Sequence, residues 1–232
     1  MSRSFPRSPT LVGPGATRGP KVEIVIVCEG EKTEPQYFRD CVEYFGAGTV
    51  RLSIIAPAGV PMTLVKCAIQ ERHELIEKNR RSKDSFDSCF RVWAVFDRDA
   101  HPNVTTAIAL AQSYSIDVAF SNPCFELWPI LHLQDFGAQK GRHELQKLLK
   151  TLMISYDHDK GAIIDFDQIR EGFVDAYTRA EQHLRDREAE GVKLGNPATT
   201  VGRLVRKIIE NGKHGNRELQ SILSRLPPNP AP

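Results

Sequence analysis

Four acidic residues stand where they can bind a divalent cation together. Glu29 and Asp97 directly follow runs of apolar residues rich in β-branched or aromatic side chains. Asp99 comes two residues after Asp97, and Glu126 falls in the first turn of the helix expected after a further strand. Magnesium prefers oxygen ligands at roughly 2.0–2.1 Å and keeps several waters, so two or three carboxylates are enough to hold it. The alternative, in which the two aspartates only cap the next helix, leaves Glu29 unexplained. The pattern therefore favours a site for Mg²⁺ or Mn²⁺.

The stretch VIVCEGEKTEP, residues 25–35, also invites comparison with a phosphate-binding loop. Such a loop requires the pattern G-x-x-x-x-G-K-[ST], whose backbone amides surround the phosphates. Here Gly30 lacks the upstream glycine that the pattern needs, and three glutamates lie in the same stretch. Negative charge at that density repels a pyrophosphate. An acidic metal site is the favoured interpretation.

Further polar residues close to these carboxylates have two interpretations each. Lys32 either contacts a substrate phosphate or balances the neighbouring glutamates. Asn122 either positions the substrate or holds the turn that follows it. Thr33 and Glu34 are expected to cap the next helix. Alternatively, Glu34 contacts the metal ligands without binding the metal itself.

The elements that would position these residues alternate between strands and helices. Strands are expected at Val22–Cys28, Val50–Ala56, Phe90–Phe96 and Ile116–Phe120. Four helices are expected between and after them: Gln36–Tyr44, a long helix that begins at Pro61, a helix that follows His101–Pro102 and ends at Tyr114, and Pro123–His132. This order predicts an α/β fold with a mostly parallel four-stranded sheet flanked by helices. In such a sheet, functional groups gather beyond the carboxyl ends of the strands. All four carboxylates are expected at that edge.

The chain divides by composition into four segments. Residues 1–20 are rich in Pro, Gly, Ser and Arg and are expected to form a disordered basic tail. Residues 21–138 form the α/β domain, residues 139–226 a helical C-terminal subdomain, and residues 227–232 a Pro-rich tail. Residues 22–139 carry 11 basic and 16 acidic side chains, whereas residues 140–232 carry 16 basic and 13 acidic ones. An acidic middle between basic ends suits a metal site flanked by phosphate-binding surfaces, and ordinary solvated surface is the alternative.

The length and the cysteine content limit which class of protein this chain can be. A chain of 232 residues is long enough to bury a substantial core. The five cysteines form no C-x-x-C pair and are expected to be reduced thiols. No apolar run is long enough to cross a bilayer, and no secretory signal is visible at the N-terminus. A cytoplasmic protein without a membrane partner is expected.

Several motifs resemble a known family. A glutamate-glycine after the first strand and an Asp-x-Asp after a later one look like the Toprim domain of topoisomerases, primases and related nucleases. The segments CEGEKTEPQYF, VFDRD, SNPCFELW and NPATTV together resemble the RloB family over about residues 22–210. This resemblance implies a Toprim-like fold and a nuclease of phage defence, since RloB-like proteins occur near restriction-modification and abortive-infection loci in bacteria. The absence of a tyrosine-nucleophile module argues against topoisomerase activity.

The resemblance also implies roles for individual residues. Glu29 matches the Toprim glutamate, and Asp97 and Asp99 match its metal-binding aspartates. Glu126 falls in the family's N-P-x-F-E-L segment and would be an additional ligand of the metal or of a water. In SYDHDKGA, Tyr156 and Lys160 resemble a Y-x-x-x-K pattern, whose lysine would reach the scissile phosphate.

These expectations combine into a Mg²⁺- or Mn²⁺-dependent phosphodiesterase acting on DNA or on a structured RNA such as tRNA. Glu29 would act as general base or as a ligand of a second ion. Two alternatives stay open: a nucleotidyltransferase of the Toprim type, and a module that is active only with a partner defence protein such as an ATPase. The sequence leaves the oligomeric state open, a homo-oligomer included.

Overall fold

The structure is a computed structural model that describes residues 22–46, 48–57, 59–81, 89–98, 103–212 and 216–228. Three features expected from the sequence fall wholly or mostly outside these ranges: the basic tail 1–20, the side chain of Asp99, and the Pro-rich tail 227–232.

A five-stranded sheet forms the centre of the molecule. Its strands are β1 (Val22–Cys28), β2 (Val50–Ile55), β3 (Phe90–Asp97), β4 (Asp117–Asn122) and β5 (Ala198–Thr199). They lie in the order β2-β1-β3-β4-β5, and β1 to β4 are mutually parallel. The first four strands begin and end within two residues of the positions expected from their apolar runs. The α/β class and the mostly parallel sheet are confirmed.

The expected strand count of four is wrong, because β5 adds a fifth strand antiparallel to β4. Its two residues are too few to show any periodicity. They pair with Ser121 and Asn122, and the hydroxyls of Ser121 and Thr199 lie 3.1 Å apart in the buried interior. This strand exists only because the C-terminal part of the chain returns to the sheet.

The helices are α1 (Thr33–Cys41), a π-helical turn (Val42–Gly46), α2 (Pro61–Arg81), α3 (Val104–Ser113), α4 (Leu127–Leu133), α5 (Arg142–Leu152), α6 (Phe166–Ile169), α7 (Phe173–Ala189), α8 (Val201–Glu210) and α9 (Arg217–Arg225), with short 3₁₀ turns at His158–Lys160 and Arg170–Gly172. Helix α8 lies within the segment expected to be helical, and its apolar side chains are buried, with Leu204 and Ile208 at 0% exposure. Helix α9 carried no strong sequence signal and was not expected.

Pro123 does not start a helix, contrary to the sequence-based expectation. The Asn122–Pro123 peptide bond is cis, and the chain turns through Cys124 and Phe125 before α4 begins at Leu127. The expectation rested on the preference of proline for the first helical position. A turn before the helix is the other place where proline fits, and local sequence does not distinguish the two.

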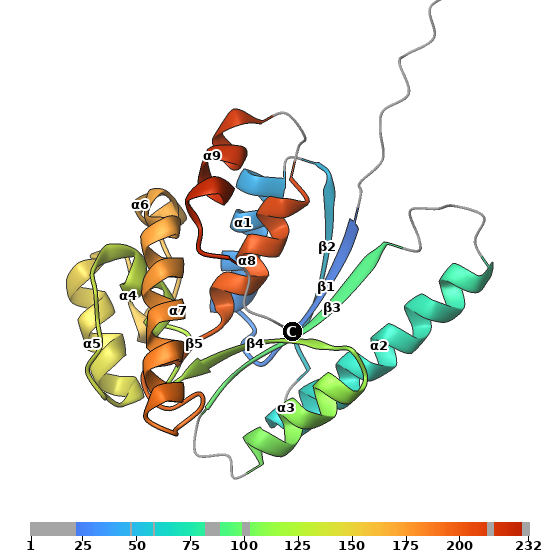
Figure 1. Ribbon diagram of the computed structural model, residues 1–232, viewed down its shortest axis with the longest axis horizontal. Coiled ribbons are helices and arrows are strands. Elements are labelled where there is room, and N and C mark those ends of the chain that lie inside the picture. The colour runs from blue at the N-terminus through green and yellow to red at the C-terminus, as the bar shows by residue number, and fades with distance from the viewer. Residues whose placement is uncertain are drawn as a thin grey trace, which may run out of the picture.

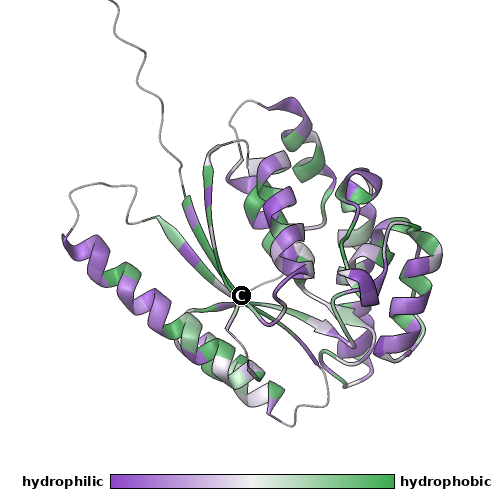
Figure 2. Ribbon diagram, turned by 180° about the vertical axis from the view of Figure 1, so that it is seen from behind, coloured by the Kyte–Doolittle hydropathy of each residue, from purple (hydrophilic) through white to green (hydrophobic). Residues whose placement is uncertain are grey.

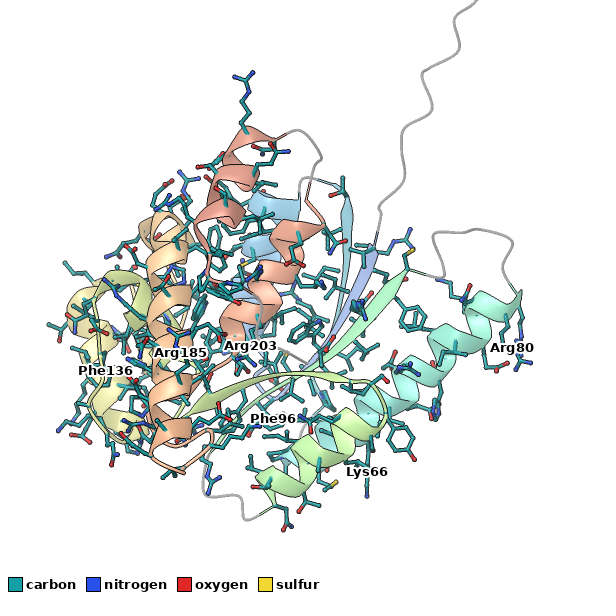
Figure 3. All side chains as sticks on the ribbon, in the orientation of Figure 1. Lys66, Arg80, Phe96, Phe136, Arg185 and Arg203 are labelled. Atoms are coloured by element: carbon teal, nitrogen blue, oxygen red, sulfur yellow. The ribbon has the colours of Figure 1, made fainter. Side chains whose placement is uncertain are left out.

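Helices cover both faces of the sheet, as Figure 1 shows. Helices α2 and α3 cover one face, and their Leu64, Val65 and Ala107 pack with Val27 and Phe96 of the sheet. Phe96 is labelled in Figure 3 on this side. Figure 2 shows mostly hydrophobic strands, with hydrophilic residues concentrated on the helices, the distribution expected of a sheet buried on both sides.

The second face carries a larger core that the C-terminal part of the chain completes. Leu149 of α5, Tyr177 of α7 and Leu204 of α8 belong to the same buried cluster as Ile24 and Ile26 of β1. Within the described ranges, no helix combines the length and the apolar character that a membrane span needs.

Candidate active site

The carboxyl ends of three neighbouring strands meet at one rim of the sheet. The backbone N–H of Glu29 donates to the carbonyl oxygen of Val95 at 3.2 Å, which places the end of β1 beside the end of β3. The N–H of Arg98 donates to the carbonyl of Ser121 at 2.8 Å, which places β3 beside β4 in the same way. Parallel strands lie about 4.8 Å apart, so the backbones of Glu29 and Asp97 are close neighbours. The meeting of these strand ends is confirmed.

Glu34, in the first turn of α1, joins this rim. A Cβ built on Gly30 would collide with the Glu34 carboxylate, so only glycine leaves room for the carboxylate there. Burial, with smaller contributions from the charges of Glu126 and Glu29, raises the pKa of Glu34 from 4.5 to about 7, against the opposing effects of a backbone hydrogen bond and of Arg142. A carboxyl group in this environment exchanges its proton near neutral pH. The expected capping role receives no support, because no side-chain cap hydrogen bond is present at the N-terminus of α1 within the described chain.

Asp97 lies at the end of β3 with its side chain 13% exposed. Nη2 of Arg142, at the start of α5, donates to Asp97 Oδ2 at 3.3 Å. Burial raises the pKa of Asp97 well above its ordinary range, and the charges of Glu34 and Glu126 add to this effect. Arg142 opposes the shift without cancelling it. Several carboxyl groups therefore share a poorly solvated space in which they disfavour each other's ionisation.

Glu126 is held in place by hydrogen bonds from two residues of the C-terminal part of the chain. The Tyr156 hydroxyl donates to Glu126 Oε1 at 2.7 Å, and Nε2 of Gln146 donates to the same oxygen at 3.2 Å. Glu126 is 6% exposed and Tyr156 fully buried. Burial, followed by the charge of Glu126, raises the pKa of Tyr156, so its hydroxyl stays a proton donor to Glu126.

His158 stands at the solvent side of this group. Its Nδ1 lies 3.6 Å from Glu126 Oε1 and 3.5 Å from the Tyr156 hydroxyl, while its side chain is 51% exposed. A half-exposed imidazole beside a buried carboxylate can transfer protons between that carboxylate and solvent.

The other three site residues proposed from the sequence, Lys32, Asn122 and Lys160, form no hydrogen bond or ion pair with these carboxylates within the described part of the chain. Lys32 is exposed, and its backbone carbonyl accepts from Gln36 at the start of α1. The side-chain amide of Asn122 donates to the carbonyl of Leu194 at 2.9 Å, which ties it to the segment before β5 rather than to the turn at Pro123. Lys160 is exposed on the 3₁₀ turn two residues after His158, where its charge acts on Asp157.

Sequence reasoning missed Arg142, Gln146 and His158 as members of this group. Arg142 and Gln146 lie on a helix of ordinary amphipathic pattern, and no local spacing connects them with Asp97 or Glu126. His158 stands between the two residues of SYDHDKGA that drew attention, Tyr156 and Lys160. Both this segment and the N-P-x-F-E-L segment that contains Glu126 match motifs of the family, and this shared match was the signal that could have drawn attention to His158.

The donor set suits a hard divalent cation, since it consists of carboxylate oxygens at one rim. Among the described residues, no group of three or more His, Cys, Asp or Glu side chains is already arranged around a common metal position. Part of each carboxylate is engaged by the protein, Asp97 by Arg142 and Glu126 by Tyr156 and Gln146. Asp99, the other half of the expected aspartate pair, lies outside the described residues.

Comparison with known proteins identifies one family. The model of the RloB-like protein family matches residues 24–208, which confirms the resemblance seen in the motifs. The chain has no match among curated proteins or solved structures.

Proposed function

Since the chain belongs to the RloB-like family, we propose that it is a Mg²⁺- or Mn²⁺-dependent phosphodiesterase that hydrolyses nucleic acid, on a sheet of the Toprim type. One observation carries the proposal: Glu34, Asp97 and Glu126 share a poorly solvated rim with the end of β1, where Glu29 stands. Buried like charges are costly unless an ion or a reaction uses them. A divalent cation is the simplest partner for such a group.

The residues divide by role according to their surroundings. Asp97, Glu29 and Asp99 would hold the cation, with Glu126 as a further ligand of the ion or of a water. When bound, the ion neutralises charge on the scissile phosphate and lowers the pKa of a water. Glu29 would serve as general base if it is not itself a ligand.

Proton transfer around this rim can be assigned to residues of the chain itself. Glu34 has a pKa of about 7 and can accept a proton at neutral pH. His158 connects Glu126 with solvent over the 3.6 Å separation described above. These two residues offer a route by which protons enter and leave a largely buried site.

Exposed cations around the rim would bind the substrate backbone. Lys32 lies on the β1–α1 connection and Lys160 on the turn that carries His158, so each stands beside a part of the carboxylate group. Lysine binds phosphate as a point charge without reading the base. The role in phage defence that the family resemblance implies is part of this proposal, and so is the open choice between DNA and RNA.

The test is cleavage of labelled duplex DNA, single-stranded DNA and tRNA with Mg²⁺ or Mn²⁺, by wild type and by Asp97→Asn. Loss of one metal-binding carboxylate should lower the rate by about 10³-fold. The matched control is Asp117→Asn, an exposed aspartate at the opposite end of the sheet on β4. It should cut like wild type. Undiminished cutting by folded Asp97→Asn would contradict the proposal.

A further inference from the structure

Arg142 is a cation that stands among the rim carboxylates. Its Nη2 donates to Asp97 Oδ2 at 3.3 Å, across 45 positions of sequence. Burial is the main cause that raises the pKa of Glu34 and of Asp97, and the charge of Arg142 opposes both shifts. The guanidinium therefore acts on carboxylates from two separate elements, α1 and β3.

The position of Arg142 on its helix is unfavourable for a cation. Arg142 is the first residue of α5, and the N-terminus of a helix carries a partial positive charge that repels cations. Glu144, in the same turn, accepts from the backbone N–H of Gly141 at 2.9 Å and from Lys140 Nζ at 2.8 Å, so it is engaged with other donors. Helix stability therefore gives no reason for an arginine at this position, whereas the rim carboxylates do.

The side chain of Arg142 connects the rim with solvent. It is 38% exposed, whereas the Asp97 side chain that it contacts is 13% exposed. Hydrogen bonds between oppositely charged groups are ordinarily about 2.7–2.9 Å long, so the 3.3 Å contact is a long one. A long contact on a partly exposed side chain can be exchanged for another partner while α5 stays in place.

Arg142 would compete with a divalent cation for Asp97. An ion at roughly 2.1 Å from Asp97 Oδ2 would stand no more than about 5.4 Å from Arg142 Nη2, given the contact described above. Two positive centres at that separation repel each other even in a water-like dielectric. The planar fork of N–H donors that fits a carboxylate also fits a phosphate. A guanidinium that leaves Asp97 is therefore suited to bind the substrate backbone.

We propose that Arg142 is a substrate-binding residue that first takes the place of the cation: its guanidinium neutralises Asp97 until a divalent cation binds there, and then leaves this carboxylate and binds a backbone phosphate of the nucleic-acid strand. The phosphate would lie beside Asp97, because the ion that neutralises it is bound there. It would therefore be within reach of a side chain that already contacts this aspartate. The inference rests on the proposed function for both the cation and the phosphate.

The first test is calorimetric titration of the whole chain with MnCl₂ in the absence of nucleic acid. Arg142→Gln removes the competing charge, so it should bind Mn²⁺ about tenfold tighter than wild type. An arginine that only supports the site would have the opposite effect, because its loss would disorder the carboxylates and weaken the binding of the ion. Lys147→Gln is the matched control. It removes the same charge from an exposed position on α5 and should bind Mn²⁺ within about twofold of wild type.

The second test is fluorescence anisotropy of a labelled DNA single strand of about 20 nucleotides with saturating Ca²⁺, which takes the same oxygen ligands. Arg142→Gln should bind the strand about fivefold more weakly than wild type. The slope of log affinity against log salt should also be smaller by about 0.7, the value for one phosphate contact. In EDTA, where Arg142 stays on Asp97, the two proteins should bind the strand alike.

Arg142→Lys is the second variant, and it decides the question if circular dichroism shows that Arg142→Gln does not fold. It keeps a charge beside the carboxylates but loses the planar fork. Its hold on Asp97 should be weaker than that of the arginine. It should therefore bind Mn²⁺ about threefold tighter than wild type, and the strand in Ca²⁺ about twofold more weakly.

Equal or weaker Mn²⁺ binding by the folded Arg142 variants, or no Mn²⁺ binding by any of the proteins, would overturn the inference. So would tighter Mn²⁺ binding without a loss of strand binding in Ca²⁺, or a wild type that does not bind the strand in Ca²⁺. If the two affinities change in opposite directions as expected but the wild type cleaves no nucleic acid, the proposed hydrolysis fails while the role of Arg142 stands.

Discussion

Helices α2 and α3 cover one face of the sheet, and helices that include α1, α4, α7 and α8 cover the other. The two faces bury different kinds of group. On the first, Val65, Ala107 and Phe120 meet in an apolar cluster. On the second, the Trp128 ring N–H donates to the Tyr37 hydroxyl at 2.6 Å in the buried interior. The second face also buries Glu126 and Tyr156.

This difference separates stability from chemistry. Apolar contacts are non-directional, so the α2/α3 face can hold the sheet without fixing any one atom. Hydrogen-bonded buried polar groups specify positions, and a missing partner leaves the full desolvation cost. The face that buries polar groups is the one beside which the carboxylates gather. Figure 3 labels Arg203 of α8 on this second face of the sheet, where its Nε donates to Glu181 of α7 at 2.7 Å.

Leu64→Ala tests the first half of this comparison and should have the largest effect. Leu64 belongs to α2 and is fully buried against the sheet, so the truncation should reduce the free energy of unfolding by about 3 kcal/mol. Urea unfolding measures this loss. Activity per folded molecule should stay within about twofold of wild type, since a remote cavity does not touch the transition state. Impaired cleavage by fully folded Leu64→Ala would break the separation between the two faces.

The pH dependence of stability tests the second face. Folding raises the pKa of Glu34 from 4.5 to about 7, so the folded chain holds this proton more tightly than the unfolded chain. The stability gained from the proton is fully present below pH 4.5 and is lost as the pH rises through 7. Glu34→Gln removes the titration. The difference between wild type and this variant should change by about 2–3 kcal/mol between pH 4.5 and 8 without metal. If the difference in free energy of unfolding between wild type and Glu34→Gln stayed constant across that pH range, the assignment would be contradicted.

Tyr156→Phe sharpens the comparison within the second face. It removes the hydroxyl that donates to Glu126 at 2.7 Å, which should cost about 1–2 kcal/mol of stability. It should also lower activity by about tenfold, as losing a group that orients a ligand commonly does. The matched control is Tyr177→Phe, another buried tyrosine on this face, whose hydroxyl meets Arg206 instead. Equal activity losses in both variants would remove the special role of Tyr156.

Gly30→Ala should have the smallest effect on stability and a selective effect on activity. The new methyl group displaces the Glu34 carboxylate, the flexible end of a side chain, so stability should fall by less than about 1 kcal/mol. Displacing that carboxylate should reduce activity about fivefold. Gly137→Ala, where the added Cβ meets no described atom within 4 Å, is the control. A Gly30→Ala variant as active as Gly137→Ala would mean that the position of Glu34 is unimportant.

The α2/α3 face and the strand ends could be predicted from sequence because their signals are local. A buried parallel strand is a short β-branched run, and Val22–Cys28 was located to the residue. The parallel topology then implied that Glu29 and Asp97 meet. The same reasoning placed Glu126, shortly after the fourth strand, at this edge, and the family motifs suggested its role.

The partners of these carboxylates could not be predicted because they come from distant segments. Arg142 reaches Asp97 across 45 positions, and Tyr156 reaches Glu126 across 30. Such contacts depend on how α5 and the 3₁₀ turn pack on the sheet, which no window of sequence encodes. Strand β5, the second pairing partner of β4, is only two residues long and was not predicted for the same reason.

The most direct test of the central claim is a crystal structure of the protein soaked in Mn²⁺, with anomalous diffraction used to locate the ion. The account predicts an anomalous peak in coordination contact with the Asp97 carboxylate and with at least one of Glu29, Asp99 and Glu126. A fully occupied ion bound elsewhere, or no peak at this rim at millimolar Mn²⁺, would contradict it.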